Sequence, residues 1–237
     1  MPPPTITAEL LAFHQLTPHV REFRFRPLQP TRVPFNAGQY INIVVDPGDD
    51  SRPAITRAYS LCTPPHETGY LGVVANLVPG GAGSSFLFNL HPGQVLTLRG
   101  PLGSFTLDER GTRDYLFVAT GTGIGPIRSM LRSLLARGTD RQVTLYWGLR
   151  HDADVYYQDE WQQLVAAHAN FHFVTTLSQP SATWSGVVGR VTQLVAQRIT
   201  TVKDLDVYLC GRGEMIQDVR AYLKTLGLCP VHMEKFF

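Results

Sequence analysis

The spacing of turn residues changes near residues 108–114, and this change constrains the fold more than any other feature. Before it, short apolar segments are separated by pairs such as Pro47-Gly48 and Pro92-Gly93, as in antiparallel sheets. After it, apolar strands alternate with helical segments, which is typical of a parallel sheet covered on both faces. The 237 residues are enough for two domains, each with its own core.

Residues 1–110 are predicted to form an antiparallel six-stranded β-barrel, because short strands at this spacing with turns between them indicate such a barrel. The expected strands are 5–14, 20–26, 39–45, 56–62, 71–78 and 95–99. Residues 111–237 are predicted to form an α/β domain with a parallel sheet. Its expected strands are 115–119, 143–149, 171–176, 207–210 and 231–235, and its expected helices are 126–137, 158–168, 191–199 and 214–226. Pro126 is suited to the start of its helix and Gly138 to the end.

A glycine-rich turn, Gly121-Thr122-Gly123-Ile124-Gly125-Pro126, directly follows the first strand of the α/β domain. Ligands of parallel α/β sheets bind beyond the carboxyl ends of the strands. Glycines there allow close backbone approach, and free N–H groups at a helix start attract pyrophosphate. The turn departs from G-x-G-x-x-G at Pro126, and glycines also serve plain connections. It nevertheless predicts a dinucleotide site.

A second group of candidates lies in the barrel half, at Arg57-Ala58-Tyr59-Ser60. An arginine can neutralise a diphosphate, a tyrosine can lie against an isoalloxazine ring, and a serine can hydrogen-bond to the ring edge. Further along, Gly83, Ser84 and Ser85 offer donors for the other side of the diphosphate. Both motifs also have an interpretation without a ligand. The first can be a polar strand whose arginine is hydrogen-bonded within the protein, and the second can be a simple hairpin turn.

The ordered set of motifs resembles the ferredoxin–NADP reductase superfamily of flavoproteins over nearly the whole chain. The matching segments are Gly38-Gln39-Tyr40, Arg57 to Ser60, Pro79-Gly80-Gly81 with Ser84, Gly100 to Phe105, Gly121 to Pro126, Tyr146 to Arg150, Asp159-Glu160, and Cys210-Gly211 with Met215. The resemblance implies FAD on the barrel through the Arg57 motif. It also implies NADH or NADPH on the Gly121 turn.

The resemblance further implies two catalytic residues. Ser60 would hydrogen-bond near the flavin N5, and Cys210 would lie near the point of hydride transfer. Cys210 can also be a packing residue, since free cysteines are among the most buried residues. Arg212 departs from the family, whose members commonly have proline after the Cys-Gly pair. The terminal Phe236 and Phe237 resemble an aromatic cover of the flavin, or they close the sheet edge.

The choice between NADH and NADPH is less well determined. Ser178 follows the third strand of the α/β domain, where NADP-specific relatives place a serine followed by an arginine. Here Gln179 follows, which removes one cation for a 2′-phosphate. We therefore expect NADH to be used at least as well as NADPH, unless Arg150 or Arg212 holds the phosphate.

These features predict an FAD-dependent oxidoreductase that passes electrons from NAD(P)H to an external carrier protein, such as a ferredoxin, a flavodoxin or an oxygenase component. One alternative is an NAD(P)H:flavin reductase that releases free reduced flavin. Another is a non-catalytic electron-transfer subunit of a larger complex.

Composition excludes several other classes. A net charge of +2 argues against nucleic acid as the main partner. Cys62, Cys210 and Cys229 are too scattered for an iron–sulfur cluster, so no metal is expected. No apolar run reaches the roughly 18 residues of a membrane span. Met1-Pro2-Pro3-Pro4 lacks the features of a signal peptide, so the expected location is cytoplasmic.

Overall fold

The computed structural model describes residues 3–236, which divide into two compact units. The first unit extends to Leu107 and includes the segment Arg128–Ser133. The second unit comprises Asp108–Ile127 and the chain from Leu134 onward. The boundary proposed from the sequence, between residues 110 and 111, lies in the segment that follows Leu107.

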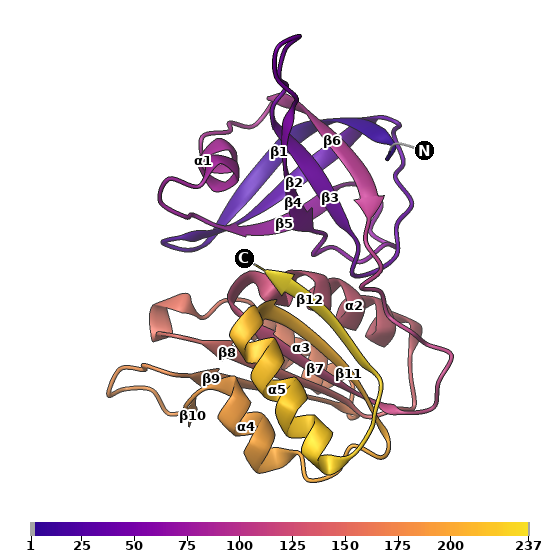
Figure 1. Cartoon of the computed structure of the whole chain (residues 1–237), viewed down its shortest axis with the longest axis vertical. Coiled ribbons are helices and arrows are strands. Elements are labelled where there is room, and N and C mark those ends of the chain that lie inside the picture. Colours follow the sequence, from indigo (N-terminus) through magenta and orange to yellow (C-terminus); the bar gives the residue numbers. More distant parts are fainter. Residues whose placement is uncertain (1–2, 237) are drawn as a thin grey trace. The chain divides into compact units, whose positions relative to one another are not determined.

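The first unit is built on a six-stranded antiparallel sheet (Figure 1). Its strands are β1 (Thr5–Thr17), β2 (Val20–Gln29), β3 (Tyr40–Asp46), β4 (Ile55–Ser60), β5 (Leu71–Asn76) and β6 (Val95–Leu102). They are hydrogen-bonded in the order β4-β3-β6-β1-β2-β5. An isolated antiparallel bridge from Leu61 to Val73 joins the two ends of this sheet, which closes it into a barrel. The predicted antiparallel barrel is confirmed.

Alternating side chains fill the interior of the barrel. Residues such as Leu10, Phe23, Ile41 and Leu98 are wholly buried, as the two-residue period of a half-buried strand requires. The short helix α1 (Ala82–Phe88) was not predicted. Seven residues are too few for a helical period to stand out in the sequence.

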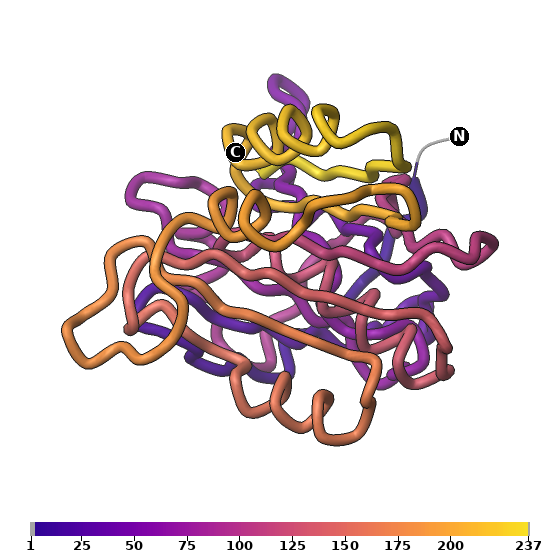
Figure 2. Tube along the Cα trace, turned by 90° about the horizontal axis from the view of Figure 1, so that it is seen from below, coloured from indigo at the N-terminus to yellow at the C-terminus, as the bar shows by residue number. Residues whose placement is uncertain are grey.

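The second unit is a parallel sheet with helices on both faces. The strands are β7 (Asp114–Thr120), β8 (Val143–Leu149), β9 (Phe171–Leu177), β10 (Val187–Val188), β11 (Leu205–Arg212) and β12 (Val231–Phe236), and the helices are α2 (Ile124–Arg137), α3 (Gln158–Ala167), α4 (Val191–Arg198) and α5 (Gly213–Leu226). The strand order is β10-β9-β8-β7-β11-β12, and every pair is parallel. Figure 2 shows α5 and α3 on opposite sides of this sheet. The predicted α/β domain is confirmed. The structure adds the two-residue strand β10, which was not predicted.

Periodicity explains how the helices attach to the sheet. Leu116 and Val118 of β7 and Leu209 of β11 belong to the core formed with α4 and α5. The alternate residues of the same strands, including Phe117 and Tyr208, stack on each other with ring centroids 5.1 Å apart. Because successive side chains of a strand point to opposite faces, Tyr208 therefore lies on the other face from Leu209.

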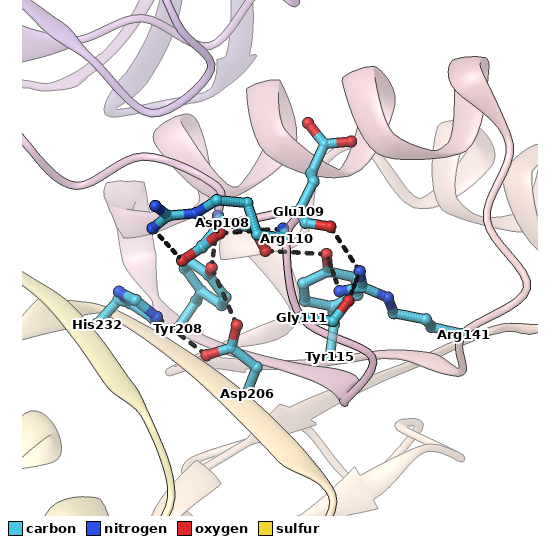
Figure 3. Close-up of polar contacts among 9 residues, drawn as sticks. All are labelled: Asp108, Glu109, Arg110, Gly111, Tyr115, Arg141, Asp206, Tyr208 and His232. Carbon is cyan, nitrogen blue, oxygen red and sulfur yellow. Dashed lines mark hydrogen bonds and ion pairs between the residues drawn. The ribbon is translucent and has the colours of Figure 1, made fainter.

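A polar network lies at the amino ends of β11 and β12 (Figure 3). Asp206 Oδ1 lies 2.9 Å from His232 Nε2, and the Tyr208 hydroxyl donates to Asp206 Oδ2 at 3.4 Å. The Asp108 N–H in turn donates to the Tyr208 hydroxyl oxygen at 2.8 Å. Burial raises the pKa of the Asp206 carboxyl. The polar groups of Asp206, Tyr208 and His232 thus have hydrogen-bond partners within the protein at this end of the sheet.

Candidate functional site

The strand order of the second unit reverses between β7 and β11. From β7 the sheet proceeds through β8 and β9 on one side and through β11 and β12 on the other. Ligands of open α/β sheets bind beyond the carboxyl ends of the strands at such a reversal. The predicted turn Gly121 to Pro126 follows β7, and Cys210, Gly211 and Arg212 end β11. The two sequence motifs therefore come together at the expected edge.

The two motifs approach each other through their backbones. A Cβ atom on Gly123 would lie 2.5 Å from the Cys210 carbonyl oxygen, and one on Gly211 would lie 2.1 Å from Thr120 Oγ1. Gly211 also has a φ of 139°, a backbone conformation that residues with a side chain rarely adopt. The Arg212 N–H donates to Thr120 Oγ1 at 3.1 Å. Only glycine therefore fits at positions 123 and 211. Thr120 also belongs to this site, although the sequence analysis did not identify it.

Helices α2 and α5 both begin at this edge, so the positive ends of their helix dipoles lie here. Gly121–Gly123 form a 3₁₀ turn, and α2 starts at Ile124, two residues earlier than predicted. Pro126 is then the third residue of α2, where its missing N–H has no partner within the helix. Among the described residues, no side chain caps the first turn of α2 or of α5. The backbone N–H groups and the helix dipoles fit an anionic diphosphate.

Cys210 is wholly buried on β11. Burial raises the pKa of its thiol well above the usual value, and the charge of Glu234 adds to this rise. The thiol is therefore neutral at neutral pH and can serve as a packing surface or a weak donor. Cys62 is also buried, whereas Cys229 is partly exposed.

Arg150 and Gln179 are neighbours at the carboxyl ends of β8 and β9. The Arg150 Nε–H donates to Gln179 Oε1 at 3.2 Å, and the Gln179 N–H donates to the Arg150 carbonyl at 2.8 Å. Ser178 donates its N–H to the carbonyl of Leu149 at 3.1 Å. Arg150, one of the two arginines considered for the 2′-phosphate, is thus hydrogen-bonded to Gln179, the residue that stands where an arginine was expected.

In the first unit, the two barrel motifs meet at Gly83. A Cβ atom on Gly83 would lie 2.6 Å from both Arg57 Cγ and the Tyr59 hydroxyl. Arg57 is exposed and donates to the Thr56 carbonyl at 2.8 Å. Tyr59 is half-buried, and this burial raises the pKa of its phenol to about 12, so the hydroxyl stays protonated. The first turn of α1 therefore faces the Arg57-Ala58-Tyr59-Ser60 strand at van der Waals range.

The remaining barrel candidates have different surroundings. Ser60, at the end of β4, is buried, and Ala58 is exposed. The Ser84 hydroxyl accepts the Val78 N–H at 3.0 Å and lies 3.2 Å from the Gly81 carbonyl. Ser84 thus closes the turn before α1 with its side chain, and its N–H lies in the first turn of the helix. Ser85 is partly exposed, and Phe237 lies outside the described residues.

In residues 3–236, no group of three or more His, Cys, Asp and Glu side chains is arranged to hold a metal ion. Within the same residues, no helix combines the length and apolarity needed to cross a bilayer.

Comparison with known proteins assigns both units to families. Residues 7–107 match the oxidoreductase FAD-binding domain family, and residues 117–221 match the oxidoreductase NAD-binding domain family. The chain is 34% identical to ferredoxin–NADP reductase B of Sorangium cellulosum, over 97% of this chain and 96% of that protein. The chain belongs to the ferredoxin–NADP reductase superfamily. The resemblance seen in the sequence motifs is confirmed.

Other members of the superfamily are longer. The reductase component DmpP of phenol 2-monooxygenase from Pseudomonas sp. (strain CF600) is 34% identical, over 95% of this chain and 64% of that protein. The crystal structure of the cytochrome P450 reductase GcoB from Amycolatopsis superposes with a TM-score of 0.88 at 28% identity, over 98% of this chain and 70% of that one. The chain therefore spans about two thirds of these two reductases.

Membership of the ferredoxin–NADP reductase superfamily also establishes the chemistry. The chain is an FAD-dependent oxidoreductase that uses a nicotinamide dinucleotide, as predicted. The residues fit such ligands, because the exposed Arg57 packs beside the Gly83 turn, and the Gly121 turn leads into α2, whose first turn has no side-chain cap. Sequence reasoning missed the contacts that Thr120, Trp147 and Tyr156 make near the Gly121 turn. Their partners are distant in sequence, so no local pattern indicates them.

Proposed function

We propose that this reductase passes electrons from NADH or NADPH, through FAD, to an external electron-carrier protein of the ferredoxin, flavodoxin or oxygenase-component class. The main support is that each unit has a glycine-containing turn packed closely beside groups that attract an anion: Gly83 beside Arg57, and Gly123 at the start of α2 and beside the Cys210–Gly211 backbone. The names of the relatives, a ferredoxin–NADP reductase and the reductase component of a monooxygenase, support the class of acceptor. The cytoplasmic location expected from the sequence is part of the proposal.

In the first unit, we assign FAD binding to the strand and helix that meet at Gly83. Arg57 is exposed beside Gly83, and a guanidinium is well suited to bind a diphosphate. The N–H groups of Gly83 and Ser84 lie in the first turn of α1, and the Ser85 N–H follows them and donates to the Gly81 carbonyl at 2.9 Å. The Tyr59 ring would lie against the flavin, and Ser60 would hydrogen-bond to its edge.

In the second unit, we assign the dinucleotide to the carboxyl edge of the sheet. The N–H groups of Gly121, Thr122, Gly123 and Gly125 and those at the start of α5 would hold the pyrophosphate, and Arg150 would approach the adenosine ribose. Cys210, with its neutral thiol, would exclude water beside the nicotinamide. A nicotinamide supplies two electrons as a hydride, and a flavin can release them singly. The protein contributes alignment and a dry environment.

The test begins with the purified protein. We expect it to retain FAD through gel filtration and to be bleached anaerobically by NADH or NADPH, and then to reduce an added ferredoxin, flavodoxin or oxygenase component. Flavin that turns over as a substrate instead would favour the flavin-reductase alternative. A colourless protein that cannot be reconstituted with FAD would contradict the proposal.

The FAD assignment has its own variant. Arg57→Ala should weaken FAD retention by about ten- to a hundredfold, the scale of a lost charge-assisted contact. Arg52→Ala is the matched control, because Arg52 is an exposed arginine that pairs with Asp46 rather than facing Gly83. Equal FAD dissociation constants for the two variants would remove Arg57 from the site.

A further inference from the structure

Three donors converge on one carbonyl oxygen in the glycine-rich turn. The Trp147 Nε1–H donates to the Gly121 carbonyl at 3.1 Å, and the Tyr156 hydroxyl donates to the same oxygen at 3.3 Å. The third donor is the Ile124 N–H, which closes the 3₁₀ turn. The two side chains come from β8 and from the loop before α3, so the turn is fastened to two other parts of the second unit.

Both side-chain donors are themselves held firmly. Trp147 is wholly buried and Tyr156 is 6% exposed. Their rings meet edge to face, with centroids 4.7 Å apart and an interplanar angle of 86°. A buried, perpendicular pair of this kind has little rotational freedom. The Gly121 carbonyl therefore meets preorganised donors.

The backbone beside Tyr156 shows that its position is enforced. Tyr157 has a φ of 58°, and among the described residues it is the one non-glycine residue with a positive φ. Such a conformation costs on the order of 1–3 kcal/mol and persists only where the surroundings determine it. Tyr157 packs against Tyr156 at 5.0 Å and against Trp161 at 6.3 Å, between ring centroids. The positive φ of Tyr157 thus belongs to the backbone that positions the Tyr156 hydroxyl at the Gly121 carbonyl.

Planarity of the peptide bond converts this anchoring into an orientation. The Gly121 C=O and the Thr122 N–H belong to one trans peptide unit, so they point in opposite directions. The donors pull the carbonyl toward the buried rings, and the Thr122 N–H therefore points away from them. Gly121 has a φ of 52° and open space where a Cβ atom would be, so it adopts this orientation freely.

We propose that Trp147 and Tyr156 are positioning residues for dinucleotide binding. They hold the Gly121–Thr122 peptide so that the Thr122 N–H faces the pyrophosphate of NADH or NADPH. This inference rests on the proposed assignment of the dinucleotide to the Gly121 turn. It adds two side chains that need not touch the ligand, and it predicts that loss of the donor group of either weakens binding of a diphosphate.

The experiment measures ligand binding to the oxidised, FAD-loaded full chain by calorimetry. ADP-ribose has the pyrophosphate but no nicotinamide, whereas adenosine 5′-monophosphate lacks the diphosphate bridge. Tyr156→Phe keeps the ring and removes only the hydroxyl donor, whereas Trp147→Phe removes the Nε1–H donor together with part of the buried indole. Each should weaken ADP-ribose binding about three- to tenfold, as expected for one hydrogen bond, and should change adenosine monophosphate binding by less than about twofold.

The control is Tyr222→Phe. The Tyr222 hydroxyl donates to the carbonyls of Ile199 and Ala196, at 2.8 and 3.0 Å, at the end of α4. This variant also loses a tyrosine hydroxyl that bonds to backbone carbonyls, and it should bind ADP-ribose like the wild type. Wild-type ADP-ribose affinity in Tyr156→Phe, with or without a lower unfolding midpoint, would overturn the inference, even if Trp147→Phe fails to fold.

The outcome also separates this inference from the assignment beneath it. If the wild type binds ADP-ribose and the two variants bind it equally well, the positioning role fails while the dinucleotide site stands. If the wild type neither binds ADP-ribose nor is reduced by NADH or NADPH, the dinucleotide site fails and the positioning role fails with it.

Discussion

The two ends of β11 carry different kinds of contact. At the amino end, Asp206 and Tyr208 are held by side-chain hydrogen bonds with each other, with His232 and with the Asp108 N–H. At the carboxyl end, Gly211 meets the neighbouring turn through its backbone, and the Arg212 N–H bonds to Thr120. Cys210 lies on the same face as Asp206 and Tyr208, because side chains two residues apart share a face.

This contrast shows how one strand serves two purposes. Side chains that satisfy one another's polar groups hold the strands together, so the amino end contributes to stability. Close-packed glycines and helix starts without side-chain caps leave backbone N–H groups facing outward, so the carboxyl end suits an anion. Substitutions at the carboxyl end should therefore change ligand use, and substitutions at the amino end should change stability.

The largest expected effect is at Gly123. In Gly123→Ala the new Cβ atom would meet the Cys210 carbonyl at 2.5 Å, so the turn must shift. Displacements of about 1 Å in a positioned site can cost about a hundredfold in rate. We expect kcat/KM for the nicotinamide cofactor to fall by about that factor, measured by anaerobic stopped-flow reduction, with an unchanged flavin spectrum.

Gly111→Ala is the control at the amino end. Gly111 has open space where a Cβ atom would be, and it is not among the glycines of positive φ. This variant should keep wild-type kcat/KM. If both alanine variants lower the rate equally, the contrast between the two ends is wrong.

The second prediction concerns Gln179, which also lies at the carboxyl edge. Gln179→Arg would place a second guanidinium beside Arg150, and an arginine–phosphate contact contributes about 1.5–3 kcal/mol. Preference for NADPH over NADH should rise by about ten- to a hundredfold, as the ratio of the two kcat/KM values. The wild type should use NADH at least as well as NADPH.

A strong NADPH preference in the wild type would show that an existing cation holds the 2′-phosphate. Arg150→Ala and Arg212→Ala then identify which one, since the responsible variant loses the preference. Arg150 is the more direct candidate, because it is hydrogen-bonded to Gln179.

Local patterns were enough to predict most strands. The prediction for β8 has the same bounds as the structure, because polar Gln142 and Arg150 flank its apolar run. The prediction for β11 covered 207–210, whereas the strand runs from Leu205 to Arg212. Aspartate is uncommon in strands, so Asp206 was not included in the predicted strand. In the structure Asp206 is buried and paired with His232, which is distant in sequence.

The candidate site shows the same limit. The Arg57 and Gly121 motifs are short and local, so the sequence alone indicates them. Trp147 and Tyr156 meet Gly121 across 26 and 35 residues, and only the strand order brings them there. Contacts of this kind depend on topology, which no single-segment pattern encodes.

The third prediction tests Cys210 on the face it shares with Asp206. If the thiol lies beside the reacting rings, Cys210→Ala should slow flavin reduction about tenfold or more while nicotinamide binding changes little. Such a split indicates an interaction made mainly in the transition state. Cys62→Ala, which removes a second buried thiol, is the control for lost packing. Equal reduction rates in Cys210→Ala and the wild type would make Cys210 a packing residue.

The smallest expected effect is a pH dependence at the amino end. Burial raises the pKa of Asp206, while His232 and the Tyr208 hydroxyl lower it and Asp108 raises it further. A carboxyl with a raised folded-state pKa binds its proton more tightly in the folded protein. Its contribution to stability is therefore full below the unfolded pKa of about 3.9 and is lost as the pH rises through the folded value.

Comparison with Asp206→Asn isolates this contribution, because asparagine does not titrate. The unfolding midpoint of the wild type, minus that of Asp206→Asn, should decrease as the pH rises from about 4 toward neutrality. The same comparison in a His232→Gln background should show a steeper decrease, since the imidazole no longer lowers the pKa of Asp206. A difference that increases with pH would mean that the ion pair with His232 outweighs burial, and flavin reduction by the nicotinamide should be unchanged in every one of these variants.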